Sequence, residues 1–86
     1  MEAIFEAKVV GGRGALRAIR EAVGQLYEYR FFIGPRTAQL CVLLDERPSK
    51  ALVDYVEKHL ALSIAWLSND KLEAGPTSRE RLLHDP

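Results

Sequence analysis

The sequence is poor in cysteine and has no long apolar run, and each absence excludes a class of protein. Cys41 is the single cysteine among 86 residues, which excludes a disulfide framework and a zinc site built on cysteines. Its apolar neighbours predict a small buried side chain in place of a reactive thiol. No apolar segment approaches the roughly 20 residues of a membrane span, and no signal-peptide pattern is present. We therefore expect a cytoplasmic protein that does not bind membranes.

The chain also lacks a net charge, but its charges are unevenly distributed. Twelve basic and twelve acidic side chains give a formal net charge of zero. Between residues 8 and 36 the only acids are Glu21 and Glu28, against the bases Lys8, Arg13, Arg17, Arg20, Arg30 and Arg36. A local basic stretch can bind phosphates, and it equally suits a solvated helix face. Charge alone leaves both interpretations open.

Length and hydrophobic periodicity predict one small α/β domain that spans residues 1–86. Apolar runs predict three strands, at residues 3–10, 38–44 and 62–67. Spacings of three and four predict two helices, at residues 15–32 and 50–60. Strands that alternate with helices indicate right-handed crossovers and a three-stranded, mostly parallel sheet in the order β-α-β-α-β. Residues 76–86 are expected to form a short, loosely attached helical tail.

The first predicted strand is expected at an open edge of this sheet. Three strands are few for a parallel sheet that needs cover on both faces. An apolar edge strand such as residues 3–10 invites pairing with another chain. We therefore expect a homo-oligomer, or docking onto a second polypeptide.

Two short polar patterns stand out, one on the first strand and one on the first helix. Glu6 and Lys8 are two residues apart and leave one face of the strand together. A carboxylate beside an ammonium on an apolar strand is costly to bury unless it serves a site. Gln25 and Tyr29 lie one turn apart on one face of the helix. The alternative is an ion pair that protects the strand edge, with Gln25 and Tyr29 packing at the end of the sheet.

These side chains suit hydrolysis of a phosphodiester with a divalent cation. That reaction needs oxygen ligands for the metal, an activated water and a cation near the phosphate. Glu6 would bind the metal, Lys8 would neutralise developing charge, and Gln25 would hydrogen-bond in the same site. Tyr29 would touch the substrate. Phosphates of DNA would be bound by three arginines near the start of the helix, Arg13, Arg17 and Arg20.

The two patterns together resemble the PD-(D/E)XK nuclease superfamily. Glu6-Ala7-Lys8 on a strand is followed by a helix that contains Gln25-Leu26-Tyr27-Glu28-Tyr29, which is similar to the Glu-x-Lys strand and Gln-x-x-x-Tyr helix of its restriction-endonuclease-like and RecB-like members. The resemblance covers residues 3–67. It implies a restriction-endonuclease-like fold, a DNA substrate, and Mg²⁺ or Mn²⁺ as the cofactor of a hydrolase.

The sequence departs from the family at the second metal-binding acid. The family places an aspartate on a strand that precedes the Glu-x-Lys strand. Glu2 shares the face of Glu6, but four strand residues separate them by roughly 13 Å, too far to share one metal. The resemblance therefore implies one of three situations: the chain is the C-terminal half of a split or truncated nuclease, a second polypeptide supplies the missing hairpin and its acid, or the activity is lost.

Three functions remain open at this stage. The first is a metal-dependent DNA nuclease with Glu6, Lys8 and Gln25 as catalytic residues. The second is a non-catalytic assembly module that pairs through residues 3–10. The third is nucleic-acid binding without cleavage through Arg13, Arg17 and Arg20, with an affinity that falls steeply as salt is added.

Overall fold

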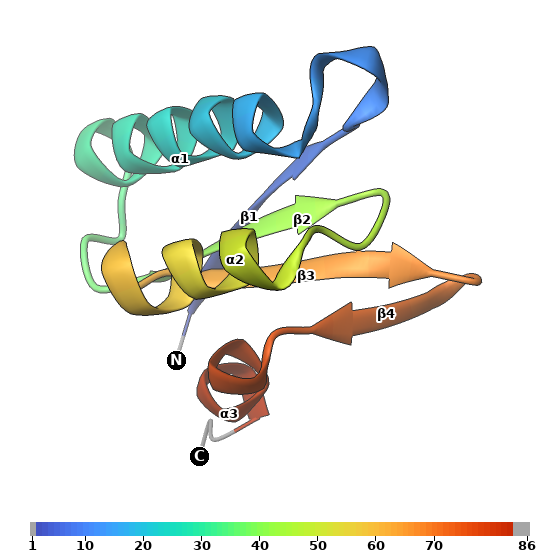
Figure 1. Cartoon of the computed structure of the whole chain (residues 1–86). Coiled ribbons are helices and arrows are strands. Elements are labelled where there is room, and N and C mark those ends of the chain that lie inside the picture. The colour runs from blue at the N-terminus through green and yellow to red at the C-terminus, as the bar shows by residue number, and fades with distance from the viewer. Residues whose placement is uncertain (1, 84–86) are drawn as a thin grey trace.

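In the computed structural model, which describes residues 2–83, two helices cover one face of a four-stranded sheet (Figure 1). No helix in this range is both long and apolar enough to cross a bilayer. The elements follow the chain in the order β1 (Ala3–Lys8), η1 (Gly11–Arg13), α1 (Ala15–Phe32), β2 (Gln39–Leu44), α2 (Lys50–Asp54), η2 (Tyr55–His59), β3 (Ser63–Ser68), β4 (Lys71–Ala74) and α3 (Pro76–Leu83).

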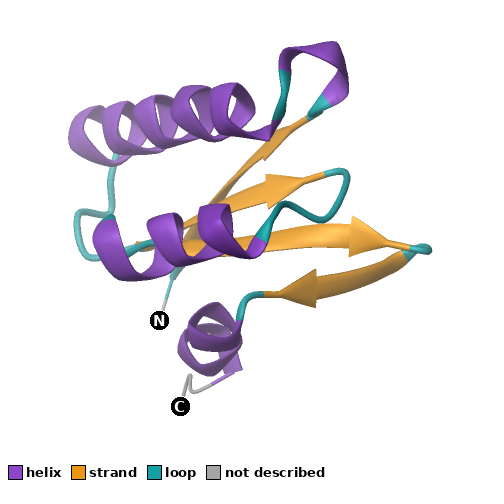
Figure 2. Ribbon diagram, viewed as in Figure 1, coloured by secondary structure: helices purple, strands orange, loops and turns teal. Residues whose placement is uncertain are grey.

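The strand order explains why α1 and α2 lie on the same face (Figure 2). The sheet runs β1-β2-β3-β4, with β1 and β2 parallel and β2 and β3 parallel. Because each crossover moves one strand in the same direction, right-handed connections place both helices on one side. β1 lies at the edge of the sheet, as expected from the sequence.

The predicted three-stranded sheet is wrong by one strand, because β4 pairs antiparallel with β3. The sheet is therefore mixed. Asn69 and Asp70 have φ values of 51° and 63°, and two consecutive positive φ angles are typical of the tight turn in a two-residue hairpin. In the sequence these polar residues indicated only the end of a strand. The four residues of β4 are too few to give a clear periodicity.

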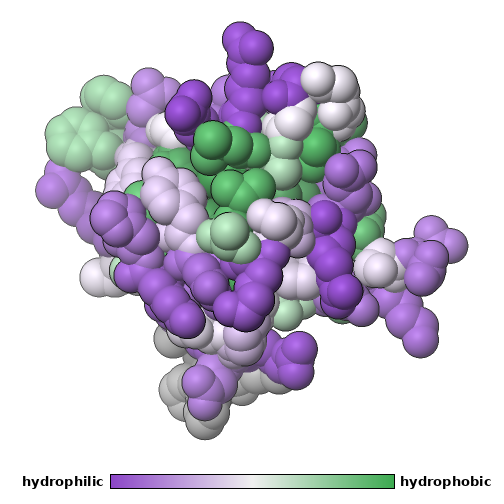
Figure 3. Space-filling model, viewed as in Figure 1, coloured by the Kyte–Doolittle hydropathy of each residue, from purple (hydrophilic) through white to green (hydrophobic). Residues whose placement is uncertain are grey.

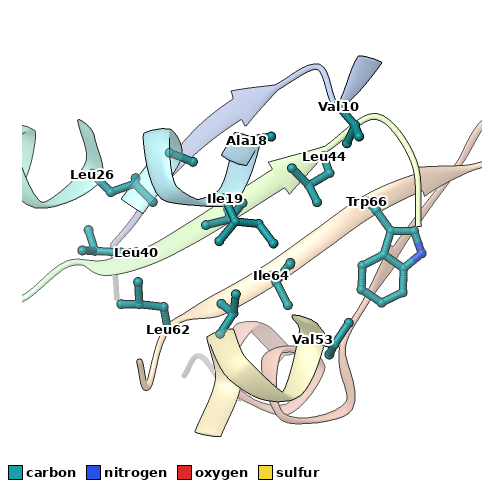
Figure 4. Packing of buried hydrophobic residues seen from close by; sticks show 13 residues of the cluster. Val10, Ala18, Ile19, Leu26, Leu40, Leu44, Val53, Leu62, Ile64 and Trp66 are labelled. Atoms are coloured by element: carbon teal, nitrogen blue, oxygen red, sulfur yellow. The ribbon is translucent and has the colours of Figure 1, made fainter. Parts of the chain in front are cut away.

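The hydrophobic core lies between α1, α2 and the inner face of the sheet (Figure 4). In β2 and β3 every second residue faces the helices. The buried contacts from α1 recur at spacings of three and four. The buried members on these elements are Ala18, Ile19, Ala22, Leu26, Leu40, Val42, Leu44, Val53, Val56, Ile64 and Trp66.

The second helical segment begins after a capping serine and ends in a wider turn. The Leu52 backbone N–H donates to the Ser49 hydroxyl at 3.3 Å, so Ser49 is the N-cap. The helix changes to π-type hydrogen bonding at Tyr55–His59. Together α2 and η2 cover the predicted range 50–60, and α1 has the predicted bounds.

The opposite face of the sheet carries apolar side chains that no long helix covers. Phe5, Leu67 and Leu72 are exposed there, one from each of β1, β3 and β4. Cys41 of β2 is nevertheless buried, as predicted, and burial raises the pKa of its thiol to about 12.

α3 is held against the edge of β3 by a buried polar contact. The Ser78 hydroxyl accepts a hydrogen bond from Ile64 N at 2.7 Å and donates one to Glu57 Oε2 at 2.6 Å. The Arg81 guanidinium donates to the backbone carbonyls of Leu62 and Glu57. These contacts hold Pro76–Leu83 more closely than the loose attachment expected from the sequence; residues 84–86 lie outside the described range.

Candidate functional site

Glu6 and Lys8 lie together on the face of β1 that is turned toward α1. The strand alternates between exposed and half-buried residues, and Glu6 and Lys8 are both on the half-buried side. Lys8 Nζ is 3.6 Å from Glu6 Oε2, and the Lys8 side chain is only 16% exposed. A lysine that is largely removed from water next to a carboxylate interacts with it more strongly than a fully solvated pair would. The two side chains thus share one face of the strand, as their spacing predicts, and they form the ion pair that was the alternative interpretation of the pattern.

Gln25 and Tyr29 border the same hollow as Glu6. α1 returns over β1 after the η1 turn (Figure 1), so one side of the helix faces the edge strand. An open hollow of about 420 Å³ lies between them, lined by Glu6, Gln25, Leu26, Tyr29 and the start of β1. Residues from both polar patterns of the sequence therefore line one site, although they are about 20 positions apart.

Glu21 is a site residue that the sequence reasoning missed. It lies one helical turn before Gln25, and its Oε1 is 3.9 Å from Lys8 Nζ. Arg13 Nη1 donates to the same oxygen at 2.6 Å. This hydrogen bond, with the charges of Arg13, Lys8 and Arg17, lowers the pKa of the exposed Glu21 carboxyl. The spacing of four between Glu21 and Gln25 was the signal that could have identified it.

The three arginines predicted to bind phosphate differ in their surroundings. Arg13 is engaged within the protein, since it also donates to the Val9 carbonyl at 3.2 Å. Arg17 and Arg20 are exposed on α1. Arg17 lies one helical turn before Glu21, and its charge contributes to the low pKa of the Glu21 carboxyl. Of the three, Arg17 and Arg20 are available to an external anion.

The backbone of β1 has a free edge beside this site. Gln39 N donates to the Glu2 carbonyl at 2.9 Å. This bond determines which residues of β1 have their backbone groups turned toward β2. Alternate residues therefore bond to β2, and the N–H and C=O groups of Ala3, Phe5 and Ala7 point away from it. The Ala7 carbonyl, between Glu6 and Lys8 in the chain, points out of the open edge, while the Glu6 and Lys8 side chains lie on the face turned toward α1. This edge can accept another strand.

Among residues 2–83, Glu6 is the one acid whose side chain lines the hollow between β1 and α1. Within this range, no group of three or more His, Cys, Asp or Glu side chains is arranged to hold an ion. Glu6 offers one carboxylate and Ala7 one carbonyl, whereas magnesium sites in proteins usually combine one or two carboxylates with waters and substrate oxygens. The hollow thus offers one carboxylate, and the other ligands of a bound cation would come from water, from the substrate or from another chain.

Comparison with known proteins leaves the candidate site to be judged on its own geometry. A scan against models of protein families, a search of curated proteins and a search of solved structures each gave no match to this chain.

Proposed function

We propose that this chain provides the catalytic edge of a metal-dependent nuclease that hydrolyses phosphodiester bonds in DNA. The observation that carries the proposal is the hollow between β1 and α1, which Glu6, Gln25 and Tyr29 line together. Lys8 does not line this hollow, but its Nζ is 3.6 Å from Glu6 Oε2. Three residues from two separate patterns thus line one hollow, and the fourth pairs with one of them.

Each side chain has a role that its chemistry and position support. The Lys8 side chain is mostly buried, so its charge would be less screened than at an open surface and could stabilise negative charge that develops on a phosphate. The Gln25 amide can donate to a phosphate oxygen or orient a water molecule. Tyr29 borders the entrance, where its ring can contact the sugar or base of the substrate. Glu6 would be a ligand of Mg²⁺ or Mn²⁺, which supplies Lewis acidity when it is bound.

The proposal requires a second acid from outside residues 2–83. The free edge of β1 is the natural place for it, because a strand added there would run directly beside Glu6 and the Ala7 carbonyl. A second polypeptide or a second copy of this chain that pairs with β1 would complete the metal site and cover the exposed edge at once.

The test is a nuclease assay on single-stranded and double-stranded DNA with Mg²⁺ or Mn²⁺, using the chain and the complex isolated with it. We expect cleavage that is abolished by Glu6→Gln and reduced about 10²-fold or more by Lys8→Met. Tyr55→Leu, on η2, is the control that should leave the rate unchanged. Cleavage that survives Glu6→Gln would contradict the assignment, and so would a complex that is inactive with both metals.

A non-catalytic assembly module is the second candidate, and the uncovered sheet supports it. β1 has a free edge, and the sheet face opposite the helices exposes Phe5, Leu67 and Leu72. This function predicts a stable oligomer without cleavage. Substituting Ala7 by proline would remove an outward N–H and should dissociate such an oligomer. A mass that stays monomeric at all concentrations in sedimentation would argue against it.

A further inference from the structure

The C-terminal end of α1 concentrates aromatic side chains on the surface. Phe31 and Phe32 are 62% and 77% exposed, and Tyr27, Tyr29 and Ile33 beside them are also exposed. Hydrophobic side chains stand out at this end of the molecule in the space-filling view (Figure 3). Four of the seven aromatic residues of the chain lie between positions 27 and 32. Exposed apolar groups gathered in this way mark a binding surface more often than an ordinary one.

Two arginines are interleaved with these rings. The Arg30 guanidinium carbon lies 5.2 Å from the centre of the Tyr27 ring, and that of Arg36 lies 5.4 Å from the centre of Phe31. Phe31 and Phe32 meet edge to face at 4.9 Å. Arg30 is fixed in place, because its Nη1 donates to the Ala38 carbonyl at 3.0 Å. Planar cations that lie over aromatic rings can stack on further rings and bond phosphates at the same time.

The rings and guanidinium groups border a hollow that suits a flat ligand. Tyr27, Arg30, Phe31 and Arg36 line an open space of about 240 Å³, which is smaller than the roughly 300–1,000 Å³ typical of pockets for drug-sized molecules. No carboxylate contributes to its lining. A nucleobase has a π face for the rings, and its phosphate has negative charge for the two arginines.

We propose that this surface, formed by Tyr27, Arg30, Phe31, Phe32 and Arg36, binds unpaired bases of single-stranded nucleic acid. Stacking needs bases that are not paired, because the faces of bases inside a duplex are already covered. The proposal deepens the proposed function and rests on it in one respect, namely that the bound strand is the one that reaches Glu6.

The position of the surface supports this connection. Tyr29 lines the hollow that contains Glu6 and Gln25. Phe32 follows Tyr29 by three residues, so it lies on a neighbouring part of the same helix side, roughly 4.5 Å further along the axis. A strand that leaves the Glu6 site along this side of α1 would therefore reach Phe32 within one or two nucleotides. Tyr27 and Phe31 lie roughly 160° around the helix from Tyr29, so the strand would cross over α1 at Phe32 to reach them.

Charge makes a smaller contribution here than stacking does. Residues 27–36 carry two arginines and one glutamate, Glu28, and the C-terminal end of a helix has partial negative charge. Attraction for phosphate is therefore modest. We expect binding with little sequence preference and a shallow dependence on salt, with a slope that corresponds to one or two phosphate contacts.

The experiment measures binding of a fluorescent ten-nucleotide oligo-dT and of a matched duplex by anisotropy, with EDTA present so that cleavage cannot occur. We expect the single strand to bind about tenfold or more tightly than the duplex. Phe31→Leu and Phe32→Leu keep the surface apolar and remove the rings, and each should weaken binding of the single strand about five- to tenfold. Tyr55→Leu, an exposed aromatic residue on η2, is the matched control and should bind as the wild type does.

Several results would overturn the proposal. Equal affinity for single strand and duplex would exclude stacking as the source of binding. Unchanged binding by both leucine variants would do the same. A wild-type dimer that both leucine variants dissociate would assign the surface to protein contacts. Thymidine monophosphate that binds as tightly as the oligonucleotide would indicate a mononucleotide site.

The same assay keeps this proposal separate from the nuclease proposal. Because EDTA removes the metal, Glu6→Gln should leave the affinity for the single strand within about twofold. Single-strand binding without any cleavage by the complex would refute the proposed function and leave the stacking surface standing. Cleavage that shows no preference for single strands and is insensitive to Phe31→Leu would support the nuclease proposal and refute the stacking surface.

Discussion

Ser78→Ala should destabilise the protein strongly, although it removes only one oxygen atom. The Ser78 hydroxyl is fully buried and makes two hydrogen bonds, from Ile64 N at 2.7 Å and to Glu57 Oε2 at 2.6 Å. Alanine would leave the Ile64 N–H without a partner, at about 1–3 kcal/mol, and would remove a bond to a buried carboxylate worth about 1.5–3 kcal/mol. The Ser78 backbone N–H would still donate to Glu57. We therefore expect a loss of about 3–4 kcal/mol.

This loss is large compared with the stability of a domain of this size. At roughly 0.05–0.15 kcal/mol per residue, 86 residues give a free energy of unfolding of about 4–13 kcal/mol. The change should lower the Tm on the order of 15–25 °C. Urea unfolding can be followed by the fluorescence of Trp66, the single tryptophan, which lies in the core.

A matched control isolates the buried hydroxyl. Thr77 precedes Ser78 in the same turn of α3 and is only half-buried, so Thr77→Ala should cost less than about 1 kcal/mol. A loss below about 1 kcal/mol for Ser78→Ala, or equal losses for the two variants, would refute the reasoning. That result would mean that the buried contact does not hold α3 against β3.

Three further outcomes follow from the core and from the charges near β1. Leu26→Ala should lower the free energy of unfolding by about 2–5 kcal/mol in urea denaturation, because a fully buried side chain would leave a cavity; a loss below 1 kcal/mol would contradict this packing. Cys41 should stay unreactive to thiol reagents in the native protein at pH 8 and should react when the protein unfolds, because burial raises the pKa of its thiol to about 12. Rapid labelling of Cys41 in the native protein would contradict its burial. Arg13→Gln should raise the pKa of the Glu21 carboxyl, because the guanidinium that lowers it is removed. The wild type should then be more stable than the variant at a pH above the usual carboxyl pKa, and this difference in stability should shrink as the pH falls through the lowered pKa of Glu21. Urea midpoints of both proteins at pH 7 and pH 3 measure the difference, and an equal difference at the two pH values would refute the coupling.

The sequence predicted the main elements because their signals are long and periodic. The bounds of α1 were correct, since its apolar spacing continues for five turns and ends at Gly34-Pro35. β4 was missed because four residues give little periodicity, and the strand is held mainly by its pairing with β3. Its turn residues, Asn69 and Asp70, are equally common at the end of any strand.

The candidate site was partly predictable for a related reason. The alternation of β1 placed Glu6 and Lys8 on one face, and helical spacing placed Gln25 with Tyr29. That the two pairs meet depends on the right-handed crossover, which the sequence pattern implied. The pairing of Arg13 with Glu21 depends on how the η1 turn folds back, and no local pattern encodes it. The exposed rings at the end of α1 looked like part of an ordinary helix until their burial was known.

The most direct test of the central claim, that Glu6 marks a metal-dependent phosphodiester site, is a titration with Mn²⁺ of the isotope-labelled chain in the complex isolated with it, followed by amide NMR. Bound Mn²⁺ broadens the signals of nearby nuclei even when binding is weak. The account predicts that the amides of Phe5, Glu6, Ala7 and Gln25 broaden first, and that Glu6→Gln removes the effect. Broadening centred on other acids, such as Asp45 and Glu46, with no effect around Glu6, would contradict it.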